Sequence, residues 1–532
     1  MDITNKGVIL KHFLLILLIL LLPLSASAAT YYIAPTGNDT TGDGSTGTPW
    51  LTLVKGMAMM SSGDTLIVKD GTYTGGSNII YYGGSTGTYP PFGSAGNYTI
   101  VKAEHDGEAI FDGEDARSMF DYTGLDAPPP YQPAYWQFEG LLWCNSTGPN
   151  VNLIGVSYVK FLRCGAYDCG DGNTNNFYIR HDDYVLLEGC YSYGTGRYKF
   201  QPYQSNHIII RNCVGRHDRH TFPAGADVVA GVSMYSVSDG LVQNCIIVDS
   251  DQVYINVDEY AGCFAIPSTD ISSHRVQYEK CIGLNTLIGG LNSAKDTWDS
   301  GFDNCVVWAA SQPAVGQGVY TLRGTSSTVT NCTLGNVQGN SLRFFNGSDN
   351  DSGPSYMGLK NNIIYNHIGD SVLMYSVYYD SYNDFYGNSN LTGYIGYAKQ
   401  TVNPLTNSLK YLPRIEAGSD LINTGESGGQ IGASCDFLIG TPGTLWGEEG
   451  YNTVTATSMW PFPNEALIKS KFAAYDEGGV DGTRGFCGGT SIGGYSQTLT
   501  RYIWEYLGNG IPADIYGDTK KSLYGGTFYG TW

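Results

Sequence analysis

Short apolar runs recur along the chain, and each is bounded by Gly, Asn, Asp or Ser. Runs such as HIIIRNCVG from His207 and GLVQNCIIVDS from Gly240 are rich in β-branched residues, which favour strands. One four-residue phrase repeats within these runs: an apolar residue, a variable residue, most often Asn, and then Cys. The phrase ends in turn at Cys164, Cys190, Cys213, Cys245, Cys281, Cys305 and Cys332, and LKNN closes the series at Asn362.

Successive phrases are separated by 26, 23, 32, 36, 24, 27 and 30 residues. The shorter intervals match one coil of a parallel β-solenoid, and the longer ones leave room for loops on one side. Asn tolerates the left-handed backbone conformation, so it suits a tight bend between two strands. The Cys then opens the next strand facing inward, and the residue two positions later (Ile247, Val307 or Leu334) shares that face.

This pattern predicts an all-β protein whose main body is a right-handed parallel β-helix. Leucine-rich and propeller repeats are disfavoured because their signatures are missing. The seven stacked cysteines are expected to be buried free thiols, since an odd number cannot pair completely. Cys435 and Cys487 fall outside the series and could form one disulfide.

The first residues indicate export. Lys6 and Lys11 precede the apolar run Phe13–Leu22, and SASAA follows, which suggests cleavage after Ala28. Residues 1–28 are therefore predicted to be a signal peptide, with a retained membrane anchor as the alternative. The run is too short to span a bilayer of about 30 Å as a helix. The mature protein is expected to be extracellular or at the cell surface, with the periplasm as a further location, and to lack a membrane span.

Three regions follow the signal peptide. Residues 29–75 are predicted to form an N-terminal cap and first coil, with an amphipathic helix between Pro49 and Gly63. Residues 76–400 are predicted to form the β-helix. A stack of coils has apolar ends that need covering, so a cap is expected at each end. Residues 401–532 are predicted to be a C-terminal capping or accessory region, with helical patterns in NEALIKSKFAAY from Asn464 and LTRYIWEYLG from Leu499.

Charge is distributed unevenly. The chain has 49 acidic and 29 basic residues and a net charge of -20, which argues against nucleic acid or anionic membranes as partners. One stretch, GRYKFQPYQSNHIIIRNCVGRHDRH from Gly196, departs from this acidity. It contains a single acid, Asp218, and the basic or histidine residues Arg197, Lys199, His207, Arg211, Arg216, His217, Arg219 and His220.

The segment TYYIAPTGNDTTGDGSTGTPWLTLVKGMAMMSSGDTLIVKDGTY, residues 30–73, resembles the opening of exported bacterial β-helix proteins of the pectate-lyase-like superfamily. These include chondroitinase-B-like and alginate-lyase-like polysaccharide lyases and group-9 pectate lyases. The resemblance implies a polysaccharide lyase acting on an acidic, uronate-containing glycan. The Trp-Ile-Asp-His and Arg-x-Pro-x-x-Arg-x-Gly signatures of common pectate lyases are missing. Chondroitinase-B-like lyases carry a Lys and then an Arg about one coil later, and Lys199 with Arg219 or Arg216 is the nearest equivalent.

The cysteine series predicts where these side chains lie. Arg197 and Lys199 follow Cys190 by seven and nine residues, and the charged residues after Cys213 follow it by three to seven. Both groups fall where loops leave the third strand, on one side of adjacent coils. The same offset places aspartates in the flanking coils, namely Asp168, Asp171, Asp249 and Asp251. An acid–base–base–acid stripe in a groove walled by loops is therefore expected.

β-Elimination from a uronate needs positive charge beside the substrate carboxylate and a base for a weakly acidic proton. We assign Lys199 as the base and Arg216 or Arg219 as the neutralising charge, with His217 or His220 as the alternative base or acid. The four aspartates are candidate Ca²⁺ ligands, because Ca²⁺ takes 6–8 oxygen ligands. Candidate sugar-binding residues are Arg197, Tyr193, Tyr198 and Tyr203.

Two other functions stay open. A non-catalytic surface or matrix protein, an adhesin or carbohydrate-binding rod, would use the same cluster for binding or for surface ion pairs of little net energy. A glycoside hydrolase would need two carboxylates about 5–10 Å apart. The β-helix itself does not choose between these functions.

Overall fold

The computed structural model describes residues 28–506, with gaps at 84–85, 125–130, 171, 219–228, 251–261, 269–271, 295–296, 313–319, 323, 325, 340–341, 345–356, 369–371, 375–376, 389–390, 393–395, 405–412, 416–418, 478 and 491–493. The predicted signal peptide, up to residue 27, and the chain beyond residue 506 lie outside the described residues. No helix in the described ranges is both long enough and apolar enough to cross a membrane.

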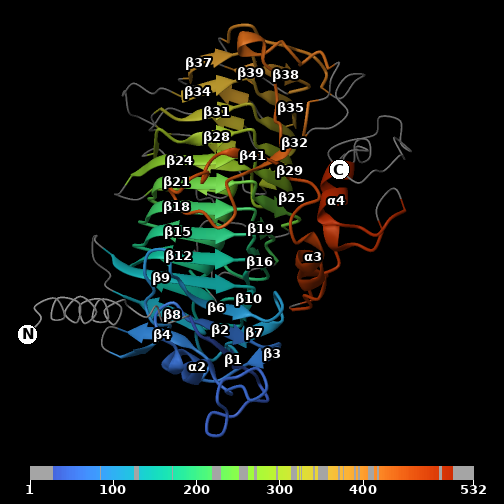
Figure 1. The fold of residues 1–532 in the computed structure, drawn as a ribbon. Coiled ribbons are helices and arrows are strands. Elements are labelled where there is room, and N and C mark those ends of the chain that lie inside the picture. Colours follow the sequence, from blue (N-terminus) through green and yellow to red (C-terminus); the bar gives the residue numbers. More distant parts are fainter. Residues whose placement is uncertain are drawn as a thin grey trace, which may run out of the picture.

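The body of the molecule is a right-handed parallel β-helix in which three parallel sheets run along the stack (Figure 1). Each coil contributes one strand to each sheet in the order A, B, C. Sheet A contains β1 (Thr30–Ile33), β2 (Thr65–Val68), β6 (Thr99–Ala103), β9 (Gln132–Glu139), β12 (Val156–Leu162), β15 (Asp183–Glu188), β18 (Asn206–Arg211), β21 (Ser238–Gln243), β24 (Ser273–Glu279), β28 (Gly301–Asp303), β31 (Thr328–Thr330), β34 (Met357–Lys360) and β37 (Val377–Ser381), with β27 (Thr297–Trp298) beside β24.

Sheet B contains β3 (Gly71–Tyr73), β7 (Ala109–Asp112), β10 (Leu141–Cys144), β13 (Gly165–Tyr167), β16 (Tyr191–Tyr193), β19 (Val214–Gly215), β22 (Ile246–Val248), β25 (Ile282–Thr286), β29 (Val306–Gln312), β32 (Thr333–Gly339), β35 (Ile363–Ile368) and β38 (Asp384–Tyr386). Sheet C contains β4 (Ile80–Gly83), β8 (Phe120–Thr123), β11 (Val151–Ile154), β14 (Asn175–Arg180), β17 (Tyr198–Tyr203), β20 (Ala230–Ser233), β23 (Gly262–Ile266), β26 (Leu291–Ser293), β30 (Tyr320–Leu322), β33 (Leu342–Phe344), β36 (Val372–Met374) and β39 (Leu391–Thr392). The short strand β5 (Gly87–Thr88) pairs with β4 in the antiparallel sense.

The repeated Asn-Cys phrase forms the turn from sheet A to sheet B, as predicted. Asn212, Asn244, Asn304 and Asn331 all have φ between 52° and 55°, the left-handed conformation that the tight bend needs. The residue after each ladder Cys pairs with its counterpart one coil on, so that Val214 lies beside Ile246, and Ile246 beside Ile282. The irregular spacing in sequence therefore becomes regular register in space, and the variable length is taken up elsewhere in the coil.

The ladder cysteines are buried in one continuous core, as expected. Each thiol points at carbonyl oxygens of its own and the preceding coil, as in the 3.5 Å contact from Cys213 Sγ to the Leu187 oxygen. The disulfide considered for Cys435 and Cys487 is not formed. Cys435 contacts the carbonyl of Asn304, whereas Cys487 contacts the guanidinium of Arg216. The two thiols therefore pack against different coils of the β-helix.

The N-terminal cap is also as predicted. Helix α2 (Leu53–Met59) lies against the first coil, with Leu53 and Met57 buried (Figure 1). Thr52 caps it by accepting a hydrogen bond from the Lys55 amide. Gly56 leaves space for Leu66 and Ile33, because a Cβ at that position would come within 3.0 Å of both side chains. The helix therefore covers the apolar end of the stack.

The C-terminal region contains the two predicted helices, α3 (Glu465–Ala473) and α4 (Leu499–Tyr506), together with a hairpin of β40 (Phe437–Ile439) and β41 (Val454–Ser458) and the 3-10 turns η1 (Glu426–Gly428) and η2 (Gly485–Cys487). Its chain runs back along the β-helix toward the N-terminal coils (Figure 1). The amide of Ala433 donates to Thr333 Oγ1, that of Ile439 to Asn244 Oδ1, and that of Gly443 to Glu188 Oε2, at 3.0, 2.8 and 2.6 Å. The described part is thus a strap along the flank.

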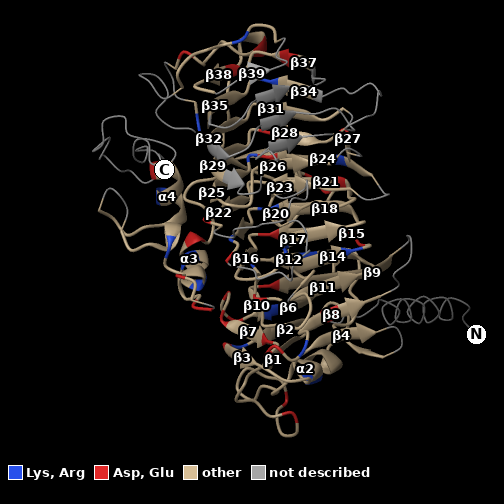
Figure 2. Ribbon diagram, turned by 180° about the vertical axis from the view of Figure 1, so that it is seen from behind, with Lys and Arg blue, Asp and Glu red and all other residues tan. Residues whose placement is uncertain are grey.

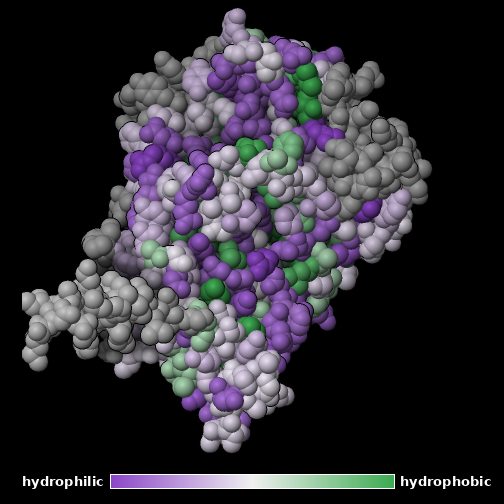
Figure 3. Space-filling view, in the orientation of Figure 1, coloured by the Kyte–Doolittle hydropathy of each residue, from purple (hydrophilic) through white to green (hydrophobic). Residues whose placement is uncertain are grey.

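Figure 3 shows the side of the molecule that carries sheet A and part of this strap. The surface is mostly hydrophilic, and its apolar areas are small and separated from one another. The strap buries apolar groups of the sheets beneath it: Leu445 packs with Leu186 and Ile209 of sheet A, and α3 and α4 cover outward-facing residues of sheet B. Sheet C is the face that the helices of the strap leave free (Figure 2).

Candidate functional site

The predicted charged stripe is found only in part, and the part that the structure describes lies under the strap; Arg197 and Lys199, which were predicted to belong to it, lie elsewhere. Asp168, His217 and Asp249 occupy equivalent positions directly after sheet B, as the register from Tyr167 through Tyr193 shows. Arg216 and Asp218 lie beside them, and all five side chains are largely or wholly buried. The other members of the stripe, Asp171, Arg219, His220 and Asp251, lie outside the described residues.

Arg216 joins the β-helix to the strap. Its side chain is 0% exposed and forms an ion pair with Asp218, with 3.0 Å between Nε and Oδ1. Nη1 donates to the Gly482 carbonyl and Nη2 to the Phe472 carbonyl, at 3.0 and 3.1 Å. Arg484 approaches Asp218 from the strap and forms a second ion pair with it. The assignment of Arg216 to a substrate carboxylate is therefore replaced by a structural role.

The two described aspartates, Asp168 and Asp249, also contact the strap. Asp168 accepts hydrogen bonds from the Thr195 amide and from Tyr475 Oη, both at 2.8 Å. Asp249 accepts from Tyr502 Oη at 2.6 Å, from Asn285 at 2.8 Å and from the Phe486 amide at 2.9 Å. Burial raises the pKa of both carboxyls. Their oxygens face hydrogen-bond donors, so these two residues do not fit the predicted Ca²⁺ site, which requires free oxygen ligands.

Lys199, the predicted base, lies at the inner corner between sheets B and C. It is 0% exposed, and Nζ donates to the carbonyls of Gly194 and Thr195, each at 2.7 Å. Burial lowers the pKa of this amine to about 8. The equivalent residue one coil earlier is Asn176, and the one a coil later is Gly231, where an added Cβ would lie 2.4 Å from the core residue Ile247. Lys199 therefore faces the interior, where a glycan cannot reach it.

The remaining predictions divide between buried and accessible positions. Tyr193 packs against Phe472 of the strap, with ring centroids 4.8 Å apart, and His217 is buried with its Nε2 3.3 Å from the Arg197 carbonyl. Tyr198 is buried beneath the Arg197 guanidinium, 4.8 Å from its ring centroid. All three side chains are buried, so Tyr193 and Tyr198 do not lie where a sugar could contact them, and His217 does not lie where it could exchange a proton with one. Arg197 and Tyr203 line a pocket.

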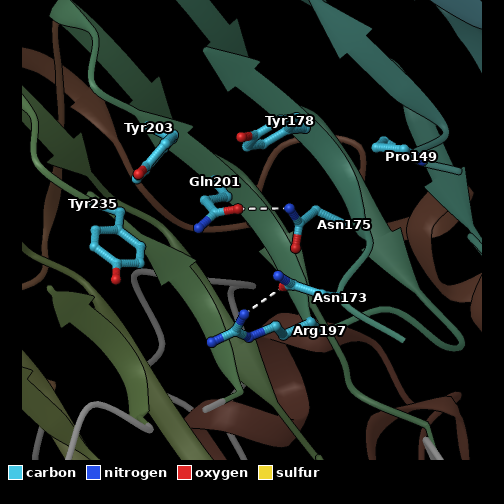
Figure 4. A pocket seen from close by; sticks show the side chains of 8 residues that line it. All are labelled: Pro149, Asn173, Asn175, Tyr178, Arg197, Gln201, Tyr203 and Tyr235. Atoms are coloured by element: carbon cyan, nitrogen blue, oxygen red, sulfur yellow. Dashed lines mark hydrogen bonds between the residues drawn. The ribbon is translucent and has the colours of Figure 1, made fainter. Parts of the chain in front are cut away.

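The pocket has a volume of about 310 Å³ and opens on the outer face of sheet C (Figure 4). Strands β14 and β17 form its floor, and the turns that lead into them form one wall. Its lining residues are Pro149, Asn173, Asn175, Tyr178, Arg197, Gln201, Tyr203 and Tyr235. The lining is mostly polar and aromatic, with Arg197 as its one charged side chain among the described residues.

Hydrogen bonds hold the polar groups of the pocket in place. Asn175 Nδ2 donates to Gln201 Oε1 at 2.6 Å, and Arg197 Nη1 donates to Asn173 Oδ1 (Figure 4). The first contact links neighbouring coils and leaves Asn175 Oδ1 and Gln201 Nε2 for other partners. The second fixes the guanidinium at the wall, where a carboxylate could take a bidentate contact.

Aromatic rings form the opposite side of the pocket (Figure 4). Tyr178 and Tyr203 stack with centroids 6.3 Å apart, and Tyr235 meets Tyr203 edge-on at 5.1 Å. The Arg180 guanidinium lies 5.7 Å from the Tyr203 ring centroid. The three tyrosines offer faces for stacking on a sugar and hydroxyls for hydrogen bonds.

Sequence reasoning missed most of this pocket. Asn173, Asn175, Tyr178, Gln201 and Tyr235 were not predicted because none of them is charged or belongs to a recognised motif. The signal available was the run NNFYIR at β14 and YKFQPY one coil later, in which Tyr178 and Gln201 face outward on a sheet. Two adjacent residues at the start of each strand, such as Asn176 and Phe177, both face inward, and this breaks simple alternation.

Metal-ligand geometry occurs elsewhere in the described structure. Asp70, Glu104 and His105 bring ligand atoms within 4.8 Å of one another, and all three are exposed. His105 Nδ1 already lies 2.9 Å from Asp70 Oδ2. The described residues that line the pocket include no Asp or Glu.

No family model and no curated protein matches this chain. Among solved structures, it is similar to the pectate lyase Pel9A, with 16% identity, a TM-score of 0.43, and coverage of 76% of this chain and 95% of that one. A rhamnogalacturonan lyase matches with 14% identity, a TM-score of 0.41 and coverage of 74% and 94%. An alginate lyase from Paenibacillus sp. strain FPU-7 matches with 12% identity, a TM-score of 0.34 and coverage of 70% and 98%. At these identities the likeness is one of fold.

Proposed function

We propose that this protein is exported and binds an acidic polysaccharide in the pocket on sheet C. The observation that carries the proposal is the lining itself: one guanidinium, Arg197, stands among three amides and three tyrosines. Arg197 pairs with a uronate carboxylate, the amides bind sugar hydroxyls, and the tyrosine rings stack on pyranose faces. The acidic protein around the pocket makes this local cation the attractive point for an anionic chain.

Affinity electrophoresis tests the proposal. The protein is run through gels that contain pectate, alginate, a rhamnogalacturonan or a glycosaminoglycan, and binding slows its migration. Retardation by at least one of these polymers, reduced in Arg197→Gln and partly restored in Arg197→Lys, is the expected result. Equal migration of wild type and Arg197→Gln in every polymer removes the pocket from consideration as the binding site.

Cleavage by β-elimination is the second candidate function, and the pocket tyrosines favour it. The proton at C5 must pass to a base within hydrogen-bond reach, and a lining tyrosine would accept it as the phenolate. The phenol so formed can return the proton to the glycosidic oxygen as the bond from that oxygen to C4 breaks and the C4–C5 double bond forms. Arg197 and Arg180 supply positive charge on either side, which an enolate-like intermediate requires. The protein would then be a lyase whose base is a pocket tyrosine, and not Lys199 as the sequence predicted.

The product of this reaction is an unsaturated uronate that absorbs ultraviolet light. Wild-type protein is incubated with each polymer that it binds, with and without Ca²⁺, and absorbance is followed. A rise that is lost in Tyr203→Phe or Tyr178→Phe, while binding is retained, supports the lyase. Binding without any rise in absorbance leaves a non-catalytic carbohydrate-binding β-helix.

A further inference from the structure

The turn at residues 194–196 links the pocket to the charged residues beneath the strap. It joins β16 to β17, and Arg197 of the pocket wall follows it directly. Gly194 and Gly196 have φ of 70° and 108°, values that other residues rarely adopt. A Cβ at Gly194 would lie 2.2 Å from Asp168 Oδ1, so only glycine lets the turn approach this carboxylate so closely.

Two amides of the turn donate to aspartates in the coils on either side of it. The Gly194 amide donates to Asp218 Oδ2 and the Thr195 amide to Asp168 Oδ1, both at 2.8 Å. The sheet B register places Asp168 in the coil before the turn and Asp218 in the coil after it. Asp218 is completely buried and Asp168 is partly buried, so water competes little for these two bonds.

Each of these aspartates is also bound by a side chain of the strap. Tyr475 Oη donates to Asp168 Oδ1 at 2.8 Å, and this is the same oxygen that accepts from the turn. Arg484 forms an ion pair with Asp218. The two carboxylates therefore bridge the strap to the two amides of the turn.

A third connection runs through His217. Arg484 Nη2 donates to the His217 carbonyl at 3.2 Å, and His217 Nε2 lies 3.3 Å from the Arg197 carbonyl. The Ala230 amide donates to the same carbonyl of Arg197 at 3.3 Å. The strap thus acts on the backbone of Arg197 itself as well as on the turn before it.

The side chain of Arg197 extends from this backbone into the pocket. It donates to Asn173 Oδ1 (Figure 4) and lies over the Tyr198 ring. A shift of the turn would move the backbone of Arg197 relative to Asn173 and so redirect the guanidinium. A bidentate contact with a carboxylate is sensitive to such a change, because two N–H groups must meet two oxygens at once.

The carbonyl side of the turn is less dependent on one partner. The Thr195 carbonyl accepts from Asn176 Nδ2 at 3.0 Å and from Lys199 Nζ at 2.7 Å, so it keeps a donor when either residue is replaced. The amides of Gly194 and Thr195 each donate to one aspartate that the strap holds. The position of the turn therefore depends more on the strap than on Lys199.

On the basis of the proposed function, we infer that Tyr475 and Arg484 of the strap are positioning residues for Arg197. The glycan site reaches its full affinity only when the strap is docked, because the docked strap fixes the turn from which the guanidinium extends. The energy of strap docking and the energy of glycan binding are then coupled, although the two regions lie on different sheets.

A double-mutant cycle measured by calorimetric titration tests this inference. Oligomers of pectate, alginate, rhamnogalacturonan and hyaluronan are screened first, and the one that wild type binds most tightly is used throughout. Tyr475→Phe and Arg484→Gln are each expected to weaken its binding about fivefold or more. Neither change is expected to weaken binding further in the Arg197→Gln background, because the group that they position is then missing.

Two other strap residues provide matched controls. Tyr502 also donates from the strap to an aspartate, Asp249, at 2.6 Å, but Asp249 lies two coils beyond the turn. Lys471 is a strap amine that pairs with Glu108. Tyr502→Phe and Lys471→Gln are expected to bind as wild type does, although Tyr502→Phe should lower the thermal unfolding midpoint as Tyr475→Phe does.

Equal affinity of wild type, Tyr475→Phe and Arg484→Gln overturns the inference. A loss of the same size in the Arg197→Gln background, or in Tyr502→Phe, also overturns it, because the effect is then one of general stability. The proposed function stands in these cases if Arg197→Gln alone weakens binding. Absence of binding to all four oligomers overturns both.

Discussion

Lys199 occupies in its coil the position that Asn176 occupies in the coil before it, and both side chains donate to the same turn. Asn176 Nδ2 lies 3.0 Å from the Thr195 carbonyl, and Lys199 Nζ lies 2.7 Å from it. The turn from Tyr193 to Thr195 is thereby held by the preceding coil, through Asn176, and by its own coil, through Lys199. Lys199 was predicted to be the catalytic base, but in the structure it stabilises a turn, because its Nζ donates to the Gly194 and Thr195 carbonyls.

This arrangement makes stability depend on pH through Lys199. Burial lowers its pKa from 10.5 to about 8. Between these values the unfolded chain holds the proton and the folded chain does not, so the free energy of unfolding rises with pH across the window. Lys199→Met removes this contribution. The stability advantage of wild type over the variant is therefore expected to grow by about 2 kcal/mol between pH 8 and pH 9.5.

Urea unfolding at several pH values measures this difference. Lys102→Met, which removes a partly exposed amine on β6 of sheet A, is the matched control. A difference for Lys199→Met that is independent of pH would contradict the assigned burial of the amine.

The seam between the β-helix and the strap depends on Asp218. This buried carboxylate pairs with Arg216 and Arg484 and accepts a hydrogen bond from the Gly194 amide at 2.8 Å. Asp218→Ala leaves two arginines without their anion, one of them fully buried, and is expected to cost about 3–5 kcal/mol. Trypsin should then cut faster after Arg484. The control is Asp481→Ala, which removes an exposed carboxylate three residues before Arg484. Equal cleavage rates in the two variants would show that Asp218 does not hold the strap.

Asp182 is a second buried acid, at the corner between sheets C and A, and it has a different effect. Oδ1 accepts a hydrogen bond from the Val156 amide at 2.7 Å, and burial raises the pKa of this carboxyl well above 3.8. Folding is favoured while the group is protonated, so its contribution is lost as pH rises through the folded pKa. Asp182→Asn keeps the acceptor and removes the charge. At pH 8 the variant is expected to be more stable than wild type by about 1 kcal/mol or more, with a smaller gain at pH 5. A variant that is less stable at both pH values would refute this account.

The thiols provide a chemical test of the core. All twelve cysteines are free in the structure. A colorimetric thiol titration in denaturant without reductant should therefore detect all of them, and the same titration of folded protein should detect very few, because every one is buried. Cys435→Ser/Cys487→Ser should lower the denatured count by two. If this double variant and wild type give equal counts, the pair is bonded to each other in the purified protein.

The fold was predictable from sequence because one local rule generates it. An Asn in the left-handed conformation followed by an inward Cys marks the same turn in coil after coil, so register follows directly from the phrase. The helices α2, α3 and α4 were predictable for a similar reason, from local periodicity alone. The path of the strap was not, since it depends on contacts such as Arg216 with Gly482, which lie 266 residues apart.

The site was only partly predictable. The cysteine series predicts one side of the β-helix for Arg216, Asp168 and Asp249, which do lie there, and also for Arg197 and Lys199, which do not. It could not show that a later segment covers that side. Arg197 and Tyr203 were predicted as sugar-binding residues and do line the pocket. Their partners Asn175 and Gln201 carry no charge and belong to no motif, so only the register of β14 against β17 identifies them.

The central claim is that the glycan site lies on sheet C and not in the charged stripe beneath the strap. It is tested most directly by calorimetric titration of one acidic oligosaccharide into wild type, Arg197→Gln and Lys199→Met, after thermal unfolding confirms that each is folded at the assay temperature. The account predicts that Arg197→Gln loses affinity by about tenfold or more, while Lys199→Met binds as wild type does. Loss of binding in Lys199→Met with full binding in Arg197→Gln would contradict it.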